Sequence, residues 1–64
     1  MEGGGTITWV GSGYIEIDGV VTYHGATTVI KFNDVPEFAV GLPVQYKGVR
    51  NADGSVTASD LEVN

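Results

Sequence analysis

The chain has 64 residues, of which eight are acidic and three are basic, giving a formal net charge of −5, and it contains no cysteine. Its length allows one domain near the small end of what folds unaided, and the lack of cysteine excludes disulfides and Cys-based metal sites. The acidic balance argues against non-specific binding to duplex nucleic acid or anionic membranes, which needs a basic surface. It does not exclude single strands, whose bases can stack on aromatic rings.

The chain starts with Met1-Glu2 and three consecutive glycines. Such a segment has little tendency of its own to become ordered. We therefore expect residues 1–4 to form a flexible tail and residues 5–64 to form a single domain.

Two runs of alternating polar and apolar residues, Thr6–Val10 and Tyr14–Ile17, flank Gly11-Ser12-Gly13. Alternation of this kind is typical of strands with one buried face, and glycine supplies the positive φ angles that a tight reversal needs. The pattern predicts a β-hairpin, on or beside which any functional surface is displayed. Period-two counting places Trp9 with Ile7 on the core face of the first strand.

The rest of the chain shows further strand signals separated by turn residues. Asp18-Gly19 between two β-branched runs is a strong hairpin signal. The segment 33–38 breaks the strand pattern, and we expect at most one helical turn there. The count is five strands, or six if Val20–Tyr23 pairs separately. The later predicted strands are Val20–Tyr23, Thr27–Phe32, Val44–Val49 and Ser55–Val63.

Short strands at this spacing, joined by Gly-rich turns, indicate an all-β domain that closes on itself. A barrel suits a chain this small because closure removes exposed strand edges. We predict a five-stranded barrel of the OB type, with an SH3-like barrel as the alternative. No apolar run is long enough for a transmembrane helix and no signal-peptide pattern is present, so we expect a cytoplasmic protein with no membrane partner.

The order of several short motifs over nearly the whole chain resembles a cold-shock domain. What the resemblance implies is an OB-fold barrel that binds single-stranded RNA or DNA by stacking bases on aromatic side chains. The family's aromatic pattern is incomplete, because Val10 and Val29 stand where it has aromatic residues. The motifs that carry the resemblance are Gly5–Trp9, Gly13–Ile15, Val29–Phe32, Gly41–Tyr46 and Gly54–Ala58.

The resemblance assigns Trp9, Tyr14, Lys31 and Phe32 to the nucleic-acid interface. The alternation favours a core position for Phe32, and for Trp9 core and surface both stay open, since a bulge at the strand end would turn the ring outward. Tyr14 points away from Ile15 and is expected to be exposed. Lys31 is expected to be exposed as well, where it can meet a phosphate.

Nothing in the sequence indicates an enzyme, a cofactor or a metal site. There is no phosphate-binding loop, no hydrolase motif and no metal-ligand spacing, and the single histidine, His24, fits a turn residue. Two alternatives to nucleic-acid binding stay open. One is a protein-interaction or structural barrel that has lost the binding face and associates with a partner or with itself through an exposed edge or apolar patch. The other is an engineered barrel without a natural function.

Overall fold

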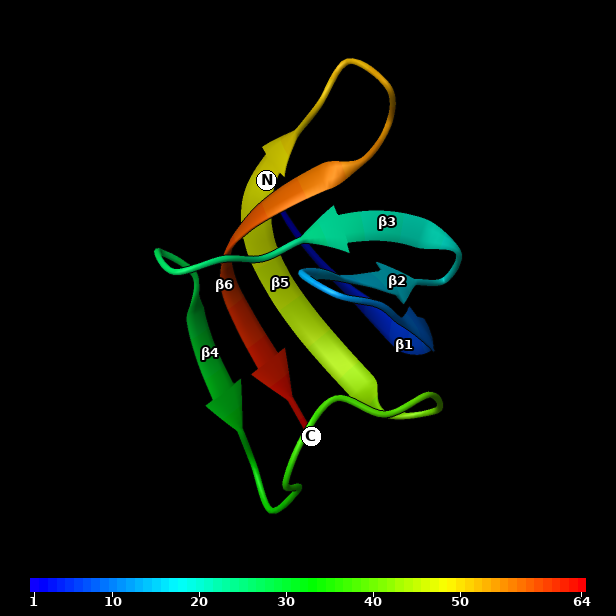
Figure 1. Ribbon diagram of the computed structural model, residues 1–64, viewed down its shortest axis with the longest axis vertical. Helices are drawn as coiled ribbons and strands as arrows, with labels where there is room; N and C mark the ends of the chain where they lie inside the picture. The colour runs from blue at the N-terminus through cyan, green and yellow to red at the C-terminus, as the bar shows by residue number, and fades with distance from the viewer.

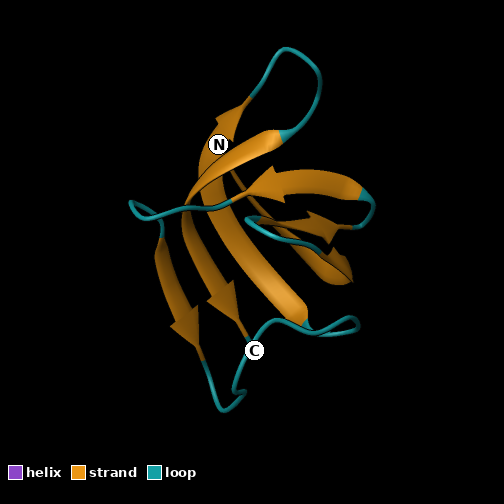
Figure 2. Cartoon of the chain, viewed as in Figure 1, coloured by secondary structure: helices purple, strands orange, loops and turns teal.

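A computed structural model describes all 64 residues and shows six strands and no helix (Figures 1 and 2). The segment 33–38 contains bends but not the single helical turn that the sequence allows. The strands are β1 (Glu2–Val10), β2 (Tyr14–Ile17), β3 (Val20–Tyr23), β4 (Val29–Phe32), β5 (Pro43–Arg50) and β6 (Val56–Val63).

Five of the six strands close into a barrel. The order along the sheet is β3-β2-β1-β5-β6, and β3 also pairs with β6, in parallel, so the first and last members of this series meet. The other neighbours within this ring are antiparallel. The structure thus confirms the predicted all-β, OB-like barrel of five strands.

The sixth strand, β4, continues the line of β3 along the same edge of β6. Tyr23 lies opposite Thr57, and Val29 lies opposite Asp60, so six steps of chain face only three steps of β6. The surplus residues, between β3 and β4, leave the sheet as a loop (Figure 1). β3 and β4 therefore occupy one edge of β6 with an interruption between them. This explains why the sequence supports a count of either five or six strands.

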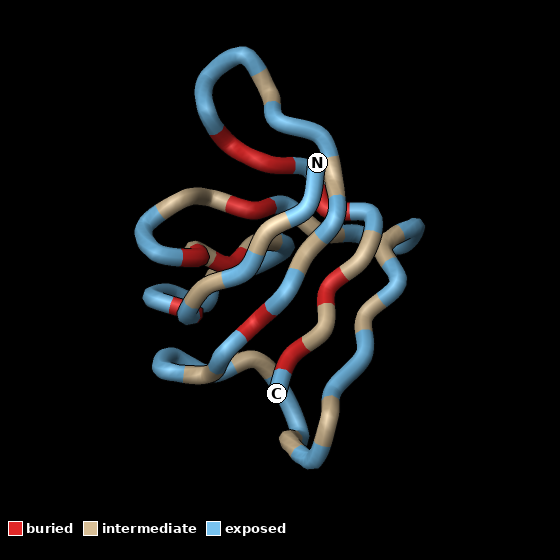
Figure 3. The backbone as a smooth tube through the Cα atoms, turned by 180° about the vertical axis from the view of Figure 1, so that it is seen from behind, coloured by how far each residue is buried: buried red, intermediate tan, exposed pale blue.

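The core is built from the inward-facing side chains of the strands. One end of the barrel is closed by the loop between β4 and β5, which we call the barrel plug. Buried and exposed stretches alternate along the backbone in Figure 3, as the period-two pattern requires. The loop between β4 and β5 packs three apolar side chains, those of Val35, Phe38 and Leu42, against the buried cluster. The cluster itself comprises Ile7, Ile15, Ile17, Val44, Ala58, Leu61 and Val63.

The N-terminal glycines differ from the expected flexible tail, because they belong to β1. Residues Glu2 to Thr6 pair with β5 in regular antiparallel register. A Cβ at Gly3 would lie 2.6 Å from the Tyr46 hydroxyl oxygen, so the Tyr46 ring takes the place of the missing side chain. The Asp18 carboxylate covers Gly5 in the same way and accepts a hydrogen bond from the Thr6 N–H at 3.1 Å. Side chains from neighbouring segments therefore cover these glycines and stabilise them as a strand. Local composition does not reveal these contacts.

Candidate nucleic-acid interface

A β-bulge turns Trp9 out of the barrel. Ile7 lies opposite Ile17, but Trp9 lies opposite Glu16, so Thr8 is an extra residue in β1. Ile7 is fully buried, whereas 54% of Trp9 is exposed. Of the two positions left open by the sequence, the structure therefore selects the surface.

The Thr8 hydroxyl anchors this bulge to the turn that follows β2. It accepts a hydrogen bond from the Gly19 N–H at 2.9 Å and donates one to the Glu16 carbonyl oxygen at 3.3 Å. The extra residue is thus held by specific bonds, as expected of a bulge that re-aims a side chain. The position of the Trp9 ring is fixed by its own hairpin.

Tyr14 lies on the same outer surface, as its alternation predicts, and it is half-buried. A Cβ at Gly11 would overlap its ring, so the ring lies flat over the glycine that ends the first strand. The Gly11 N–H also donates to the Tyr14 carbonyl oxygen at 3.0 Å. The Gly-Ser-Gly turn therefore serves both as the reversal and as a seat for the ring.

A third ring, that of Tyr23, joins this surface from β3. Tyr23 is 45% exposed and lies directly opposite Tyr14, with ring centroids 6.3 Å apart and planes tilted by 58°. Tyr23 is not among the residues that the motifs single out. The sequence nevertheless contains a signal for its position. A two-residue Asp18-Gly19 loop pairs Ile17 with Val20, and the same register pairs Tyr14 with Tyr23.

These three rings share an outer surface of β1, β2 and β3 that carries no positive charge. No lysine or arginine occurs in the three strands. Glu16 stands between Trp9 and Val21 in the cross-strand row. We call Trp9, Tyr14 and Tyr23 the aromatic surface. It offers flat apolar rings and no cation.

Phe32 lies elsewhere, at the end of β4. Its ring packs edge-on against Phe38, with centroids 5.0 Å apart and an interplanar angle of 67°, and Phe38 in turn lies 5.0 Å from the His24 ring. Phe32 is 38% exposed, so the core position favoured by the alternation is wrong. Phe32 is the last residue of β4, and its side chain packs beside the barrel plug instead of inside the barrel.

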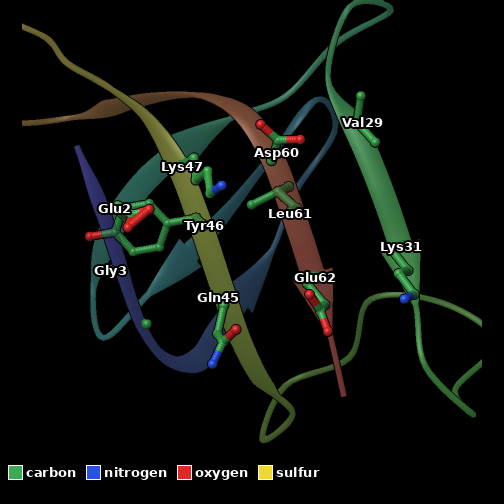
Figure 4. A pocket seen from close by; sticks show the side chains of 11 residues that line it. Glu2, Gly3, Val29, Lys31, Gln45, Tyr46, Lys47, Asp60, Leu61 and Glu62 are labelled. Atoms are coloured by element: carbon green, nitrogen blue, oxygen red, sulfur yellow. The ribbon is translucent and has the colours of Figure 1, made fainter.

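Lys31 points to a different surface again. It lies opposite Glu62 of β6 and lines a shallow groove of about 580 Å³ that crosses β4, β6, β5 and the start of β1 (Figure 4). Lys47 lines the groove too, together with the acidic side chains of Glu2, Asp60 and Glu62. The structure therefore places Trp9 on the same outer surface as the paired rings of Tyr14 and Tyr23, but it does not bring Lys31 or Phe32 to them.

Titratable groups lie mostly outside the aromatic surface. His24, predicted as a turn residue, follows β3, and its Nε2 is buried without a hydrogen-bond partner. Hydrogen bonds from the Ser55 hydroxyl and backbone N–H lower the pKa of Asp53, in the β5–β6 loop. No group of three or more His, Cys, Asp or Glu side chains is placed to hold a metal ion. No helix has the length and apolar character needed to cross a membrane.

A family model described as a domain of unknown function, DUF5666, matches residues 4–62. The match includes β2 through β5 and nearly all of β1 and β6. Comparison with curated proteins and with solved structures gave no match.

Proposed function

The chain belongs to the DUF5666 family, and we propose that this member binds single-stranded RNA or DNA weakly and with little sequence specificity. Bases would stack on the aromatic surface formed by Trp9, Tyr14 and Tyr23. The observation that supports this proposal is the presence of three partly or largely exposed rings on three adjacent strands. The resemblance to cold-shock domains points to the same class of ligand.

The arrangement of the rings suits stacking better than base-edge recognition. Every base has a π-face, so an aromatic platform accepts all of them, with about 1–3 kcal/mol per stacked base. The hydrogen-bonding side chains of this surface are the two Tyr hydroxyls, the Trp9 indole N–H and the Glu16 carboxylate. Little sequence preference is the consequence, and the proposal includes no catalytic step and no cofactor.

Charge keeps the proposed affinity low. The net charge of −5 repels a polyanion, and the aromatic surface has no cation to meet a phosphate. Since few counterions would be released on binding, affinity should fall only slightly with salt. Lys31 and Phe32 would take part only for a strand that continues from β3 onto β4. Longer oligonucleotides should therefore bind more tightly than short ones.

The test is a titration of the protein with oligo-dT or oligo-U at low salt, followed by the fluorescence of Trp9, the single tryptophan. Saturable quenching is expected, with weaker binding by Tyr23→Ala. Val29→Ala is a matched control for short oligonucleotides, which cover the rings without reaching β4, where Val29 is exposed. Absence of any change up to high micromolar strand would exclude base stacking as the function of this surface.

A further inference from the structure

The barrel leaves one strand with an open edge. β4 is hydrogen-bonded to β6 on one side and to no strand on the other, whereas each of the other strands has neighbours on both sides. The edge lies at the outer margin of the sheet, where β4 stands apart from the barrel (Figure 1). An unpaired edge presents a row of backbone donors and acceptors that can template another strand.

The free backbone groups of this edge belong to Ile30 and Phe32. The N–H of Asn33, directly after β4, donates to the Val63 carbonyl oxygen of β6 at 2.8 Å. Successive residues of a strand turn their backbone groups to opposite edges, so the groups of Lys31 also face β6. Those of Ile30 and Phe32 face outward. These backbone groups, two residues apart, have the spacing that hydrogen bonds to an added antiparallel strand require.

The side chains along the edge have a definite chemical pattern. Val29 and Phe32 are 65% and 38% exposed, and Ile30 packs against the core. Lys31 stands between apolar neighbours on both sides. The adjacent Glu62 carboxylate accepts a hydrogen bond from the Asn33 side-chain amide at 2.9 Å. A cation thus marks the centre of an otherwise apolar edge.

We propose that the open edge of β4 binds an extended segment of another protein as an added antiparallel strand. The segment carries a carboxylate opposite Lys31 and apolar side chains opposite Ile30 and Phe32. Main-chain hydrogen bonds supply the affinity and the alternate side chains supply the specificity, as in other cases of strand addition.

Charge selects such a segment over a second copy of this chain. The symmetric antiparallel register that uses all the free groups pairs Ile30 with Phe32 of the other copy, and it places the two Lys31 side chains opposite each other. Like charges directly opposed across strands are destabilising, and opposite charges stabilise. Lys31 therefore disfavours pairing of β4 with itself and favours an acidic partner.

The experiment uses two synthetic peptides, acetyl-Thr-Val-Glu-Val-Thr-amide and its counterpart with Lys in place of Glu, titrated into the intact protein. Amide chemical shifts report the site, and those of Ile30 and Phe32 should change most. The Glu peptide should bind roughly three- to tenfold more tightly than the Lys peptide. In Lys31→Glu this preference should reverse, which separates a specific register from general attraction to an acidic protein.

Three results would overturn the proposal. They are shifts centred away from β4, equal binding of the two peptides, or no shift at millimolar peptide. A symmetric dimer of the unmodified protein, detected by light scattering and abolished by Ile30→Pro, would assign the edge to a second copy instead. Since the readout is β4 and not Trp9, failure here leaves the aromatic surface untouched.

Discussion

Tyr14 and Tyr23 face each other across β2 and β3 because a two-residue turn fixes their register. Asp18 and Gly19 both have positive φ, of 50° and 82°. This conformation is favoured in tight hairpins and is readily supplied by an Asp-Gly pair. The rings are therefore brought together by the local sequence, before any ligand is present. A preformed surface reduces the conformational entropy lost on binding.

Truncating either ring of this pair should weaken oligonucleotide binding. Tyr14→Ala and Tyr23→Ala should each cost about 1–3 kcal/mol of binding free energy, the value of a stacked base. Because the rings are close, the double variant should lose a different amount from the sum of the two. Trp9 fluorescence titrations measure all three, and thermal unfolding checks that the barrel is intact. Unchanged affinity in both single variants would contradict the assignment.

The strands and turns of this barrel follow from the sequence because their determinants are local. Alternation predicts the burial of Ile7, Ile15 and Ile17, and turn chemistry predicts the reversal at Asp18-Gly19. These signals act over a few residues, so they can be recognised without knowledge of the tertiary structure. Together they predict the all-β class, and the small size of the chain adds the prediction of closure.

The features that the sequence does not reveal depend on contacts that side chains make with other strands and loops. Trp9 faces outward because the Thr8 hydroxyl is bonded to the turn at Gly19. Gly3 belongs to a strand because the Tyr46 ring covers it. Phe32 is partly exposed because it lies beside Phe38 at the barrel end. These contacts join residues from different strands and loops, separated by as few as six and as many as 43 positions, and residue periodicity carries no information on them.

Deleting residues 1–4 should destabilise the barrel, because β1 begins at Glu2. The deletion removes cross-strand pairs with β5 and uncovers one face of Tyr46. We expect a loss of about 2 kcal/mol in the free energy of unfolding, corresponding to a few backbone hydrogen bonds. Urea denaturation measures the loss. An unchanged midpoint would show that residues 1–4 do not contribute to the fold, as expected of a flexible tail.

Gly48→Ala should be far more damaging than its size suggests. The register of β5 and β6 shifts between Lys47, which lies opposite Asp60, and Gly48, which lies opposite Ala58. A Cβ at Gly48 would overlap the Thr57 carbonyl oxygen and lie 2.9 Å from the Ala58 Cα. Backbone atoms cannot swing aside, so we expect a loss of about 1–3 kcal/mol or more. That is a large part of the roughly 3–5 kcal/mol that a barrel this small is expected to have.

Gly25→Ala is the matched control for Gly48→Ala. Nothing lies within 4 Å of a Cβ at Gly25, and its φ is not positive. Its urea midpoint should equal that of the unmodified protein or exceed it slightly, because alanine restricts the unfolded chain. Equal losses in the two variants would show that the close approach at Gly48 is not the cause.

Stability should depend on pH through the β5–β6 loop. The pKa of Asp53 is lowered mainly by the Ser55 hydroxyl, which donates to Oδ1 at 2.6 Å, and then by the Ser55 N–H at 3.0 Å. A carboxyl with a lowered folded-state pKa stabilises the fold above its unfolded pKa, and this stabilisation is lost as pH falls through the folded value. Below about pH 4 the unfolded state binds the proton more readily. In Ser55→Ala, the Asp53 pKa measured by NMR should rise toward its usual value. If the Asp53 pKa were the same in Ser55→Ala as in the unmodified protein, the Ser55 hydroxyl would not be the cause of the lowered pKa.

His24→Phe should stabilise the protein. The Nε2 atom of His24 is buried with no hydrogen-bond partner, and the imidazole packs 5.0 Å from the Phe38 ring. A buried polar atom without a partner costs about 1–3 kcal/mol, whereas an apolar ring of related shape keeps the packing and removes the cost. We expect a gain of about 1 kcal/mol in urea denaturation, allowing for the larger volume of phenylalanine. His24→Ala removes the polar atom and the ring together, and it should lower stability because the packing of the ring on Phe38 is lost as well. A loss of stability in His24→Phe would contradict this prediction, and it would mean that the extra volume of phenylalanine outweighs the relief of the buried nitrogen.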